Sequence, residues 1–291
     1  MGAGHSGSTI LGVTLGNCDG FFYAGEVEEW LVTSGRPSWA DAPRRELWSQ
    51  VASLVDARGL FGPRAARAIE RSSSVLRISR LRERRRLRGP YRSVAKDLFR
   101  AIARVSGASC VVDTSHFPLR ARELSRVEGL DVRLVFLVRD ARDVVESNLR
   151  ELRPHEVAER RVRTLAMNLN LALTLAVSVV VFLRHPRSRR LFVSHEQFLA
   201  DPEQTLRAIL AMAGSDTPLP DLDELRVGAP IEGNRLIRTE TIALQRGTRK
   251  PGAPTPEASA GPASTALLQK LSELVLRRMR PAIDGAMPGV G

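Results

Sequence analysis

This chain has few of the residues that build metal sites, disulfide frameworks or base-stacking surfaces. Its 291 residues include two isolated cysteines, Cys18 and Cys110, and five scattered histidines, with no pair at metal-ligand spacing. Aromatic residues make up 5% of the chain and do not interleave with basic residues as they do in proteins that stack nucleic-acid bases. We therefore expect no metal, no nucleic-acid partner and a reducing compartment, the cytoplasm.

Lysine is almost absent, occurring only at Lys96, Lys250 and Lys270, so arginine supplies nearly all of the positive charge behind the formal net charge of +12. Because this bias runs through the whole chain, it is more typical of a GC-rich genome than of a nucleic-acid footprint. The positive field still favours anionic ligands. The arginine-rich stretch Arg77–Arg92 predicts a solvated helix surface, with an anionic acceptor site or a lid as the alternative.

Secretory and membrane-spanning signals are missing as well. Since the first motif begins at Met1, we expect no signal peptide. Leu165–Leu183 is a nearly uncharged run long enough to resemble a membrane span. Its polar interruptions, which favour a buried helix over a membrane helix, are Asn168, Asn170, Thr174 and Ser178.

A stretch rich in glycine and hydroxyl residues opens the sequence, at Met1–Leu11. Glycines allow a tight turn and a close approach to a ligand, while the amides at the start of the following helix favour an anion. The spacing of Gly2, Gly7 and Thr9 matches a nucleotide P-loop, except that Ser8 stands where the lysine belongs. Since that lysine contacts the β- and γ-phosphates of nucleotides, its loss favours a smaller anion over a magnesium-bound triphosphate. An ordinary turn before a helix is the alternative.

Apolar strand segments alternate with helical segments along the chain. This order predicts an α/β fold with a P-loop-like parallel sheet flanked by helices on both faces. The expected strands are Phe21–Ala24, Cys110–Ser115, Val132–Val138 and Arg189–Ser194. The expected helices are Thr9–Leu15, Pro43–Ala57, Pro63–Leu87, Tyr91–Val105, 118–127, Ala141–Leu152, His155–Leu183, Pro202–Ala213 and Ala263–Arg280.

The length fits a single domain over residues 1–291. Within it we expect a helical insertion on the acceptor side, about 36–105, and a looser C-terminal segment, 214–291, with a loop over Arg246–Pro262. A phosphate loop usually follows a buried strand. Since Met1 stands immediately before this loop, we expect that first strand either to lie upstream or to be dispensed with.

Polar residues follow two of the expected strands. Glu26 comes just after Phe21–Ala24, where a carboxylate can act on a ligand held by the loop; the alternative is an acidic first turn of the next helix, shared with Glu28 and Glu29. Arg139 ends the apolar run Val132–Val138, and Ser147 lies two turns into the next helix. An arginine binds phosphate through two N–H groups, and a serine hydroxyl completes the contact.

The alternative for Arg139 is a local ion pair with Asp140 or Asp143 that caps the helix.

Together these stretches resemble the sulfotransferases that use 3′-phosphoadenosine 5′-phosphosulfate (PAPS), in their bacterial, carbohydrate and tyrosyl-protein branches. Gly4–Thr9 is similar to the 5′-phosphosulfate loop, and Leu137–Ser147 to the 3′-phosphate motif. Gly25-Glu26 falls where the tyrosyl-protein branch places a glutamate base, and His195-Glu196 resembles a Tyr-Glu-Asp segment. Asp201-Pro202 matches the Asp-Pro that follows that segment.

The resemblance covers Met1 to about Gly214, and more weakly Gly233–Arg238. It implies PAPS as cosubstrate, two anion sites, no metal, and Glu26 as the base that takes the acceptor proton. The cofactor-binding residues that it implies are Gly4, His5, Ser6, Gly7, Ser8, Thr9, Arg139, Ser147, Asn234 and Arg235.

Two histidines depart from the family pattern. His5 stands where the family usually has arginine or lysine, and His116, in Asp113–His116, stands where many relatives have lysine. His116 is therefore expected to assist transfer or to serve as a second candidate base.

Two other functions stay open: a P-loop kinase or other nucleotide-binding protein, and a non-catalytic module that binds anions or nucleic acid. The sequence leaves the acceptor open among carbohydrate, glycolipid, small phenol and peptide tyrosine, and it carries no signal for oligomeric state.

Overall fold

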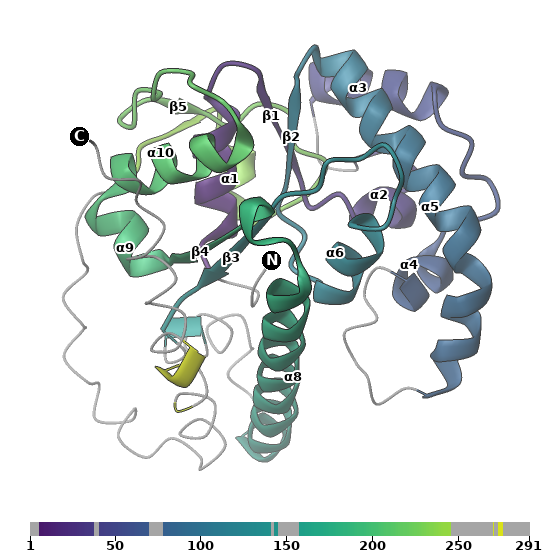
Figure 1. Cartoon of the computed structure of the whole chain (residues 1–291). Helices are drawn as coiled ribbons and strands as arrows, with labels where there is room; N and C mark the ends of the chain where they lie inside the picture. The colour runs from purple at the N-terminus through teal and green to yellow at the C-terminus, as the bar shows by residue number, and fades with distance from the viewer. Residues whose placement is uncertain are drawn as a thin grey trace.

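The computed structural model describes residues 6–37, 41–69, 78–140, 143–144, 157–245, 270 and 273–275. Four strands lie in the middle of this part of the chain, with helices on either side (Figure 1). They are β1 (Phe21–Gly25), β2 (Cys110–Asp113), β3 (Leu134–Val138) and β4 (Arg190–Ser194). All four expected strands are therefore present.

The strands pair in parallel, as predicted, but in two separate pairs instead of one sheet. β1 pairs with β2 and β3 with β4, and each pairing is parallel. Among the described residues, no strand hydrogen-bonds to both pairs, and none leads into the first helix, α1 (Ser8–Gly16). The mixed α/β class is confirmed, whereas a continuous P-loop-like sheet is not observed.

The two pairs nevertheless share one layer. Alternate residues of a strand point to opposite faces, and one core cluster collects inward-facing residues from both pairs: Tyr23, Val112, Val135, Leu137, Leu191 and Val193. The intervening residues pack on the other face, Phe22, Ala24 and Val111 in one cluster, and Phe136, Val138 and Phe192 in another.

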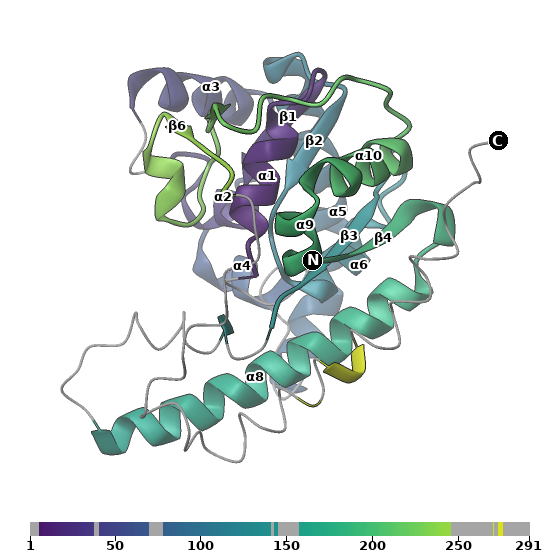
Figure 2. The same ribbon diagram turned by 90° about the vertical axis from the view of Figure 1, so that its left-hand side faces the viewer.

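Helix α1 covers the first face together with α9 (His195–Ala200) and α10 (Pro202–Ala213) (Figure 2). The chain after Gly214 completes this layer. It contains the short antiparallel pair β5 (Leu225–Arg226) and β6 (Thr241–Ile242), and the short helix η2 (Arg235–Arg238). The segment expected to be loose is thus packed as far as Leu244, since its buried members include Leu222, Leu225, Ile237 and Leu244.

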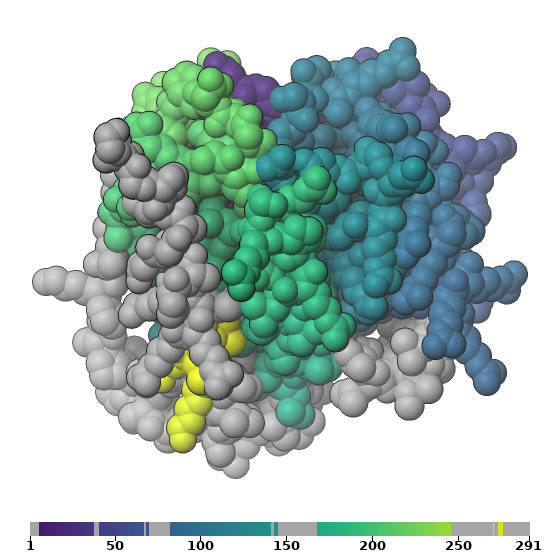
Figure 3. Space-filling model, viewed as in Figure 1, coloured from purple at the N-terminus to yellow at the C-terminus, as the bar shows by residue number. Residues whose placement is uncertain are grey.

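The second face carries the helices that connect β1 to β2 and β2 to β3. They are α2 (Glu29–Val32), α3 (Ala42–Ser53), α4 (Pro63–Ile69), α5 (Ile78–Ser106) and α6 (Pro118–Leu124). Trp30 and Trp48 are fully buried at their centre. In the space-filling view this helical region forms the right-hand part of the surface, beside α8 (Val157–Arg184) (Figure 3).

Helix α5 differs from the sequence prediction. A break was expected between Leu87 and Tyr91, yet one helix of 29 residues runs through Pro90. A proline inside a helix removes one hydrogen bond and costs about 3 kcal/mol. Packing outweighs that cost, because Leu87 before the proline and the buried Tyr91 and Leu98 after it all belong to the same apolar cluster.

Helix α8 contains the long apolar run and packs on the sheet, as predicted. Phe182 contacts Phe136 of β3, with ring centroids 5.5 Å apart. The opposite side of α8 exposes Leu169, Val180 and Leu183. Among the described helices, none is long and apolar enough to cross a membrane.

The segments expected as a helix over Ala141–Leu152, a loop over Arg246–Pro262 and a helix over Ala263–Arg280 fall largely outside the described residues.

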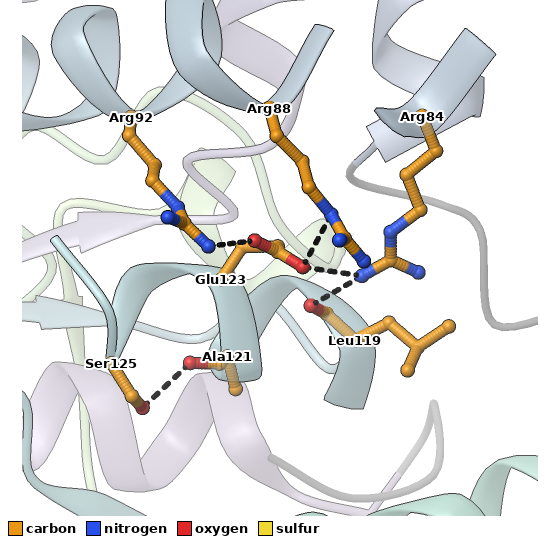
Figure 4. A network of polar contacts seen from close by, with 7 residues as sticks. All are labelled: Arg84, Arg88, Arg92, Leu119, Ala121, Glu123 and Ser125. Atoms are coloured by element: carbon orange, nitrogen blue, oxygen red, sulfur yellow. Dashed lines mark hydrogen bonds and ion pairs between the residues drawn. The ribbon is translucent and has the colours of Figure 1, made fainter. Parts of the chain in front are cut away.

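A buried carboxylate joins α5 to α6 (Figure 4). The side chain of Glu123 is 0% exposed and accepts contacts from three arginines of α5. Arg84 Nη2 and Arg88 Nε each lie 3.2 Å from Oε1, and Arg92 Nη2 lies 2.9 Å from Oε2. Burial alone raises the pKa of Glu123, but the Arg92 hydrogen bond and the neighbouring guanidinium charges outweigh it and lower the pKa.

Replacing Glu123 with Gln is expected to destabilise the fold by about 3 kcal/mol, because it leaves a buried arginine without its counter-charge. Urea denaturation would measure the change. The matched control is Glu128→Gln, at an exposed carboxylate beyond α6. An equal loss in both variants would contradict this role for the network.

Candidate functional site

The glycine-rich loop leads into α1 through a left-handed turn. Gly7, with φ of +89°, caps the helix, and the first turn of α1 contains no acidic residue. Ser6 and Thr9 are buried beside it, 2% and 7% exposed. The first amides of the helix therefore suit an anion. Gly4 and His5 lie outside the described residues.

His195, the first residue of α9, lies directly against this loop. A Cβ atom at Gly7 would fall 2.3 Å from Cδ2 and 2.6 Å from Nε2 of His195. Burial, with the nearby charge of Arg139, lowers the pKa of His195, so the imidazole is neutral at pH 7. In the sequence His195 is recognisable only as part of a motif, although its position immediately after an expected strand is a signal for a site residue.

Glu196 ties together the ends of β3 and β4. Its Oε2 accepts a hydrogen bond of 2.6 Å from Ser194 Oγ, and its Oε1 accepts one of 3.0 Å from the backbone N–H of Asp140. Asp140 immediately follows Arg139. The carboxylate of Glu196 thus fixes the backbone beside Arg139 relative to the segment that carries His195.

Arg139 extends from the end of β3 and is 21% exposed. Its Nη2 lies 3.2 Å from Asp143 Oδ2, so the local ion pair given as the alternative is formed. This pair leaves the guanidinium near His195, whose pKa it lowers. Ser147, the expected partner of Arg139 in binding phosphate, lies outside the described residues.

Glu26 lies at the end of β1, beside a distant segment of the chain. Its backbone N–H donates to the carbonyl of Glu232 at 2.8 Å. Gly25, with φ of +79°, permits this approach, since a Cβ there would fall 2.3 Å from the same carbonyl oxygen. The contact brings the exposed Asn234 and Arg235 to the end of the strand that carries Glu26.

Tyr23 links this side of the site to the loop. Its hydroxyl lies 3.4 Å from Thr114 Oγ1. Burial strongly raises the pKa of Tyr23, opposed by hydrogen bonds with Thr114 and Thr9, and Glu26 raises it further. The phenol is therefore neutral and lies between Thr9 of the loop and Thr114 after β2. In the sequence Tyr23 is recognisable only as part of the expected strand Phe21–Ala24.

Asp113 ends β2 with both carboxylate oxygens occupied. Its Oδ1 accepts from the N–H and the hydroxyl of Ser115 at 2.9 and 2.5 Å, and its Oδ2 accepts from Arg120. A kinase would use a carboxylate at the end of a strand, such as Asp113, to bind magnesium. Its hydrogen bonds give it a structural role, shaping the turn that carries the half-buried His116.

Glu28 is a second carboxylate after β1, and it is almost completely buried at 1% exposed. It stands at the start of α2 without capping the helix through its side chain. Its N–H donates to Ser115 Oγ at 3.3 Å, whereas its Oε2 has no hydrogen-bond partner among the described residues. The acidic first turn expected as an alternative is thus only partly realised, by Glu29.

The expected site residues form two neighbouring groups. One gathers Ser6, Gly7 and Arg139 around His195. The other gathers Glu26 with the segment that carries Asn234 and Arg235. Tyr23 connects them through Thr9 and Glu26. Within the described part of the chain, no cluster of three or more potential metal ligands occurs.

Two solved structures resemble this chain in fold. The sulfotransferase domain from the Synechococcus PCC 7002 olefin synthase matches with a TM-score of 0.55 at 15% identity, covering 94% of this chain and 92% of that one. The sulfotransferase domain from the curacin biosynthetic pathway matches with a TM-score of 0.51 at 15% identity, covering 94% and 95%. At this identity both structures support the fold alone.

No curated protein matches the sequence. A family model described as "Sulfotransferase family" matches residues 1–219, three quarters of the 291 residues. Together with the loop, the strand-end residues and the fold, this match shows that the chain belongs to the sulfotransferase family.

Proposed function

We propose that this sulfotransferase transfers a sulfuryl group from PAPS to an acceptor hydroxyl or amine. The observation that carries the proposal is the close packing of His195 on Gly7, with Arg139 nearby. A helix start without acidic residues and a guanidinium from another strand provide two positions for anions at one edge of the sheet. A donor with a phosphosulfate at one end and a separate phosphate at the other fits such a pair.

The chain's own residues can divide the binding of this donor between them. The loop residues Ser6, Gly7, Ser8 and Thr9, together with the preceding Gly4 and His5, would hold the phosphosulfate. Arg139 would hold the 3′-phosphate with Ser147, and Asn234 and Arg235 would complete the nucleotide site. Preorganised N–H donors stabilise the charge that develops on the leaving phosphate.

In this proposal Glu26 acts as the general base. As the acceptor oxygen bonds to sulfur, its proton passes to the carboxylate of Glu26, and the bond from sulfur to the bridging phosphate oxygen breaks. His116 is the second candidate, either as base or as a donor to the leaving phosphate. We propose a small-molecule, carbohydrate or lipid acceptor, and a cytoplasmic protein that needs neither metal nor nucleic acid.

The occupied carboxylate of Asp113 argues against a kinase, since a magnesium-bound triphosphate needs free oxygen ligands. The serine at position 8 argues in the same direction.

Adenosine 3′,5′-bisphosphate is expected to raise the melting temperature in a thermal-shift titration. At ~100 times its Kd it should stabilise the fold by roughly 2.7 kcal/mol. The controls are 5′-AMP, which lacks the 3′-phosphate, and magnesium ATP. A shift with magnesium ATP alone would favour a kinase, and no shift with any of the three would contradict a donor site.

Glu26→Gln is expected to lower turnover on the order of 10²-fold or more, because it removes the proton acceptor. The bisphosphate shift should stay nearly unchanged. Glu29→Gln, in the first turn of α2, is the matched control and should retain turnover. Unchanged turnover in Glu26→Gln would exclude Glu26 as the base.

Binding of the bisphosphate is expected to take up a proton at His195. The pKa of His195 is lowered in the free protein, and an adjacent anion favours the protonated imidazole. The affinity of the wild type should therefore increase as the pH falls from 8 to 6, by more than that of His195→Asn. Calorimetry in buffers of different ionisation enthalpy would count the protons, and equal uptake by both proteins would rule out His195 as their acceptor.

A further inference from the structure

Helix α5 presents arginines in two separate rows. The inner row, Arg84, Arg88 and Arg92, repeats every fourth residue and contacts the buried Glu123. Arg82 and Arg86 have the same spacing but are exposed on another side of the helix. The inner row neutralises Glu123. The outer pair, Arg82 and Arg86, makes no contact with that carboxylate.

A cavity of about 620 Å³ lies between α4 and α5, and Arg82 and Arg86 line it. Its apolar lining comes from Phe61, Ala65 and Leu87. A solvated helix face does not require such a hollow. The volume lies within the range of pockets that bind small organic molecules, roughly 300–1,000 Å³.

The charges around this cavity do not cancel. Arg64 and Glu83 also line it, and they pair with each other, with Arg64 Nε 2.6 Å from Glu83 Oε1. Among the described residues, neither Arg82 nor Arg86 forms an ion pair or a side-chain hydrogen bond. The cavity therefore combines an apolar lining with two uncommitted guanidinium groups, which bind carboxylate, sulfate or phosphate through paired N–H donors.

A backbone hydrogen bond connects the helix beside the cavity to the segment that follows β1. The backbone N–H of Gly62, at the start of α4, donates to the carbonyl of Leu31 in α2 at 2.9 Å. Helix α2 directly follows the segment that carries Glu26 and Glu28. The cavity therefore lies on the part of the molecule that follows β1. Arg139 and His195, which belong to the proposed donor site, follow β3 and β4 instead.

We propose that the cavity between α4 and α5 is a binding site for an organic anion with an apolar body. The apolar part packs against Phe61, Ala65 and Leu87, and the anionic group lies between Arg82 and Arg86. This site is separate from the proposed donor site, and its occupation does not depend on sulfuryl transfer.

Two fluorescent probes with closely related rings test the site on the full chain. 1-Anilinonaphthalene-8-sulfonate carries an anionic group, and N-phenyl-1-naphthylamine is the same ring system without it. The wild type should bind the sulfonate saturably and more tightly than the uncharged amine. The variant Arg82→Gln/Arg86→Gln should weaken the sulfonate at least tenfold, about 1.4 kcal/mol, and leave binding of the amine within twofold.

Arg85→Gln is the matched control, because Arg85 is an exposed arginine of α5 that does not line the cavity. It should change the affinity for the sulfonate less than twofold. A loss equal to that of the double variant would show general attraction to a basic surface and overturn the proposal.

Two further measurements locate the probe. Ala65→Phe should weaken both probes, since the larger side chain occupies the cavity, and unchanged binding of both would overturn the site. Adenosine 3′,5′-bisphosphate should not displace the sulfonate from the wild type; displacement would place the probe in the donor site and overturn the proposal.

The donor site is tested independently in the double variant. The rise in melting temperature that the bisphosphate causes in Arg82→Gln/Arg86→Gln should equal that of the wild type.

Discussion

The close approach of α1 to its neighbours is the constraint on which the site depends. Gly7 lies against His195, and a Cβ at Gly12 would fall 2.5 Å from the ring of Tyr23. Tyr23 belongs to β1, whereas His195 directly follows β4. The two pairs of strands share no hydrogen bonds among the described residues, and α1 connects them by packing on both and by the hydrogen bond between Thr9 and Tyr23. A larger side chain at either glycine would push the helix away from one pair.

Much of the fold follows from local sequence patterns. The four strands were predictable, since each is a short apolar run with polar residues after it. The two separate pairs were not, because pairing depends on contacts between segments far apart in the chain. The continuity of helix α5 was not predicted, because it too depends on contacts between distant segments. Pro90 locally indicates a helix break, but the burial of Tyr91 and Leu98 stabilises the continuous helix.

Some residues of the candidate site were likewise predictable from the sequence, and others were not. Glu26 and Arg139 were predicted as site residues because each follows an apolar segment, and in the structure they directly follow β1 and β3. His195 and Tyr23 acquire their importance only from the approach of α1, which leaves no pattern beyond the spacing of glycines. Composition was also uninformative about the arginines, since the same residue type neutralises Glu123 on one side of α5 and lines a cavity on another.

The hydrogen bonds of Glu196 have a consequence for how a long ligand would bind. One carboxylate holds the backbone of Asp140 beside Arg139, while the preceding residue, His195, lies on the loop. The two proposed anion positions are therefore fixed relative to each other before any ligand binds. Once one end of a rigid ligand is held, its other end is at a high effective concentration at the second position. Such a site selects ligands by their length. A ligand too short to reach both positions does not gain affinity from the second contact, however well one of its ends binds.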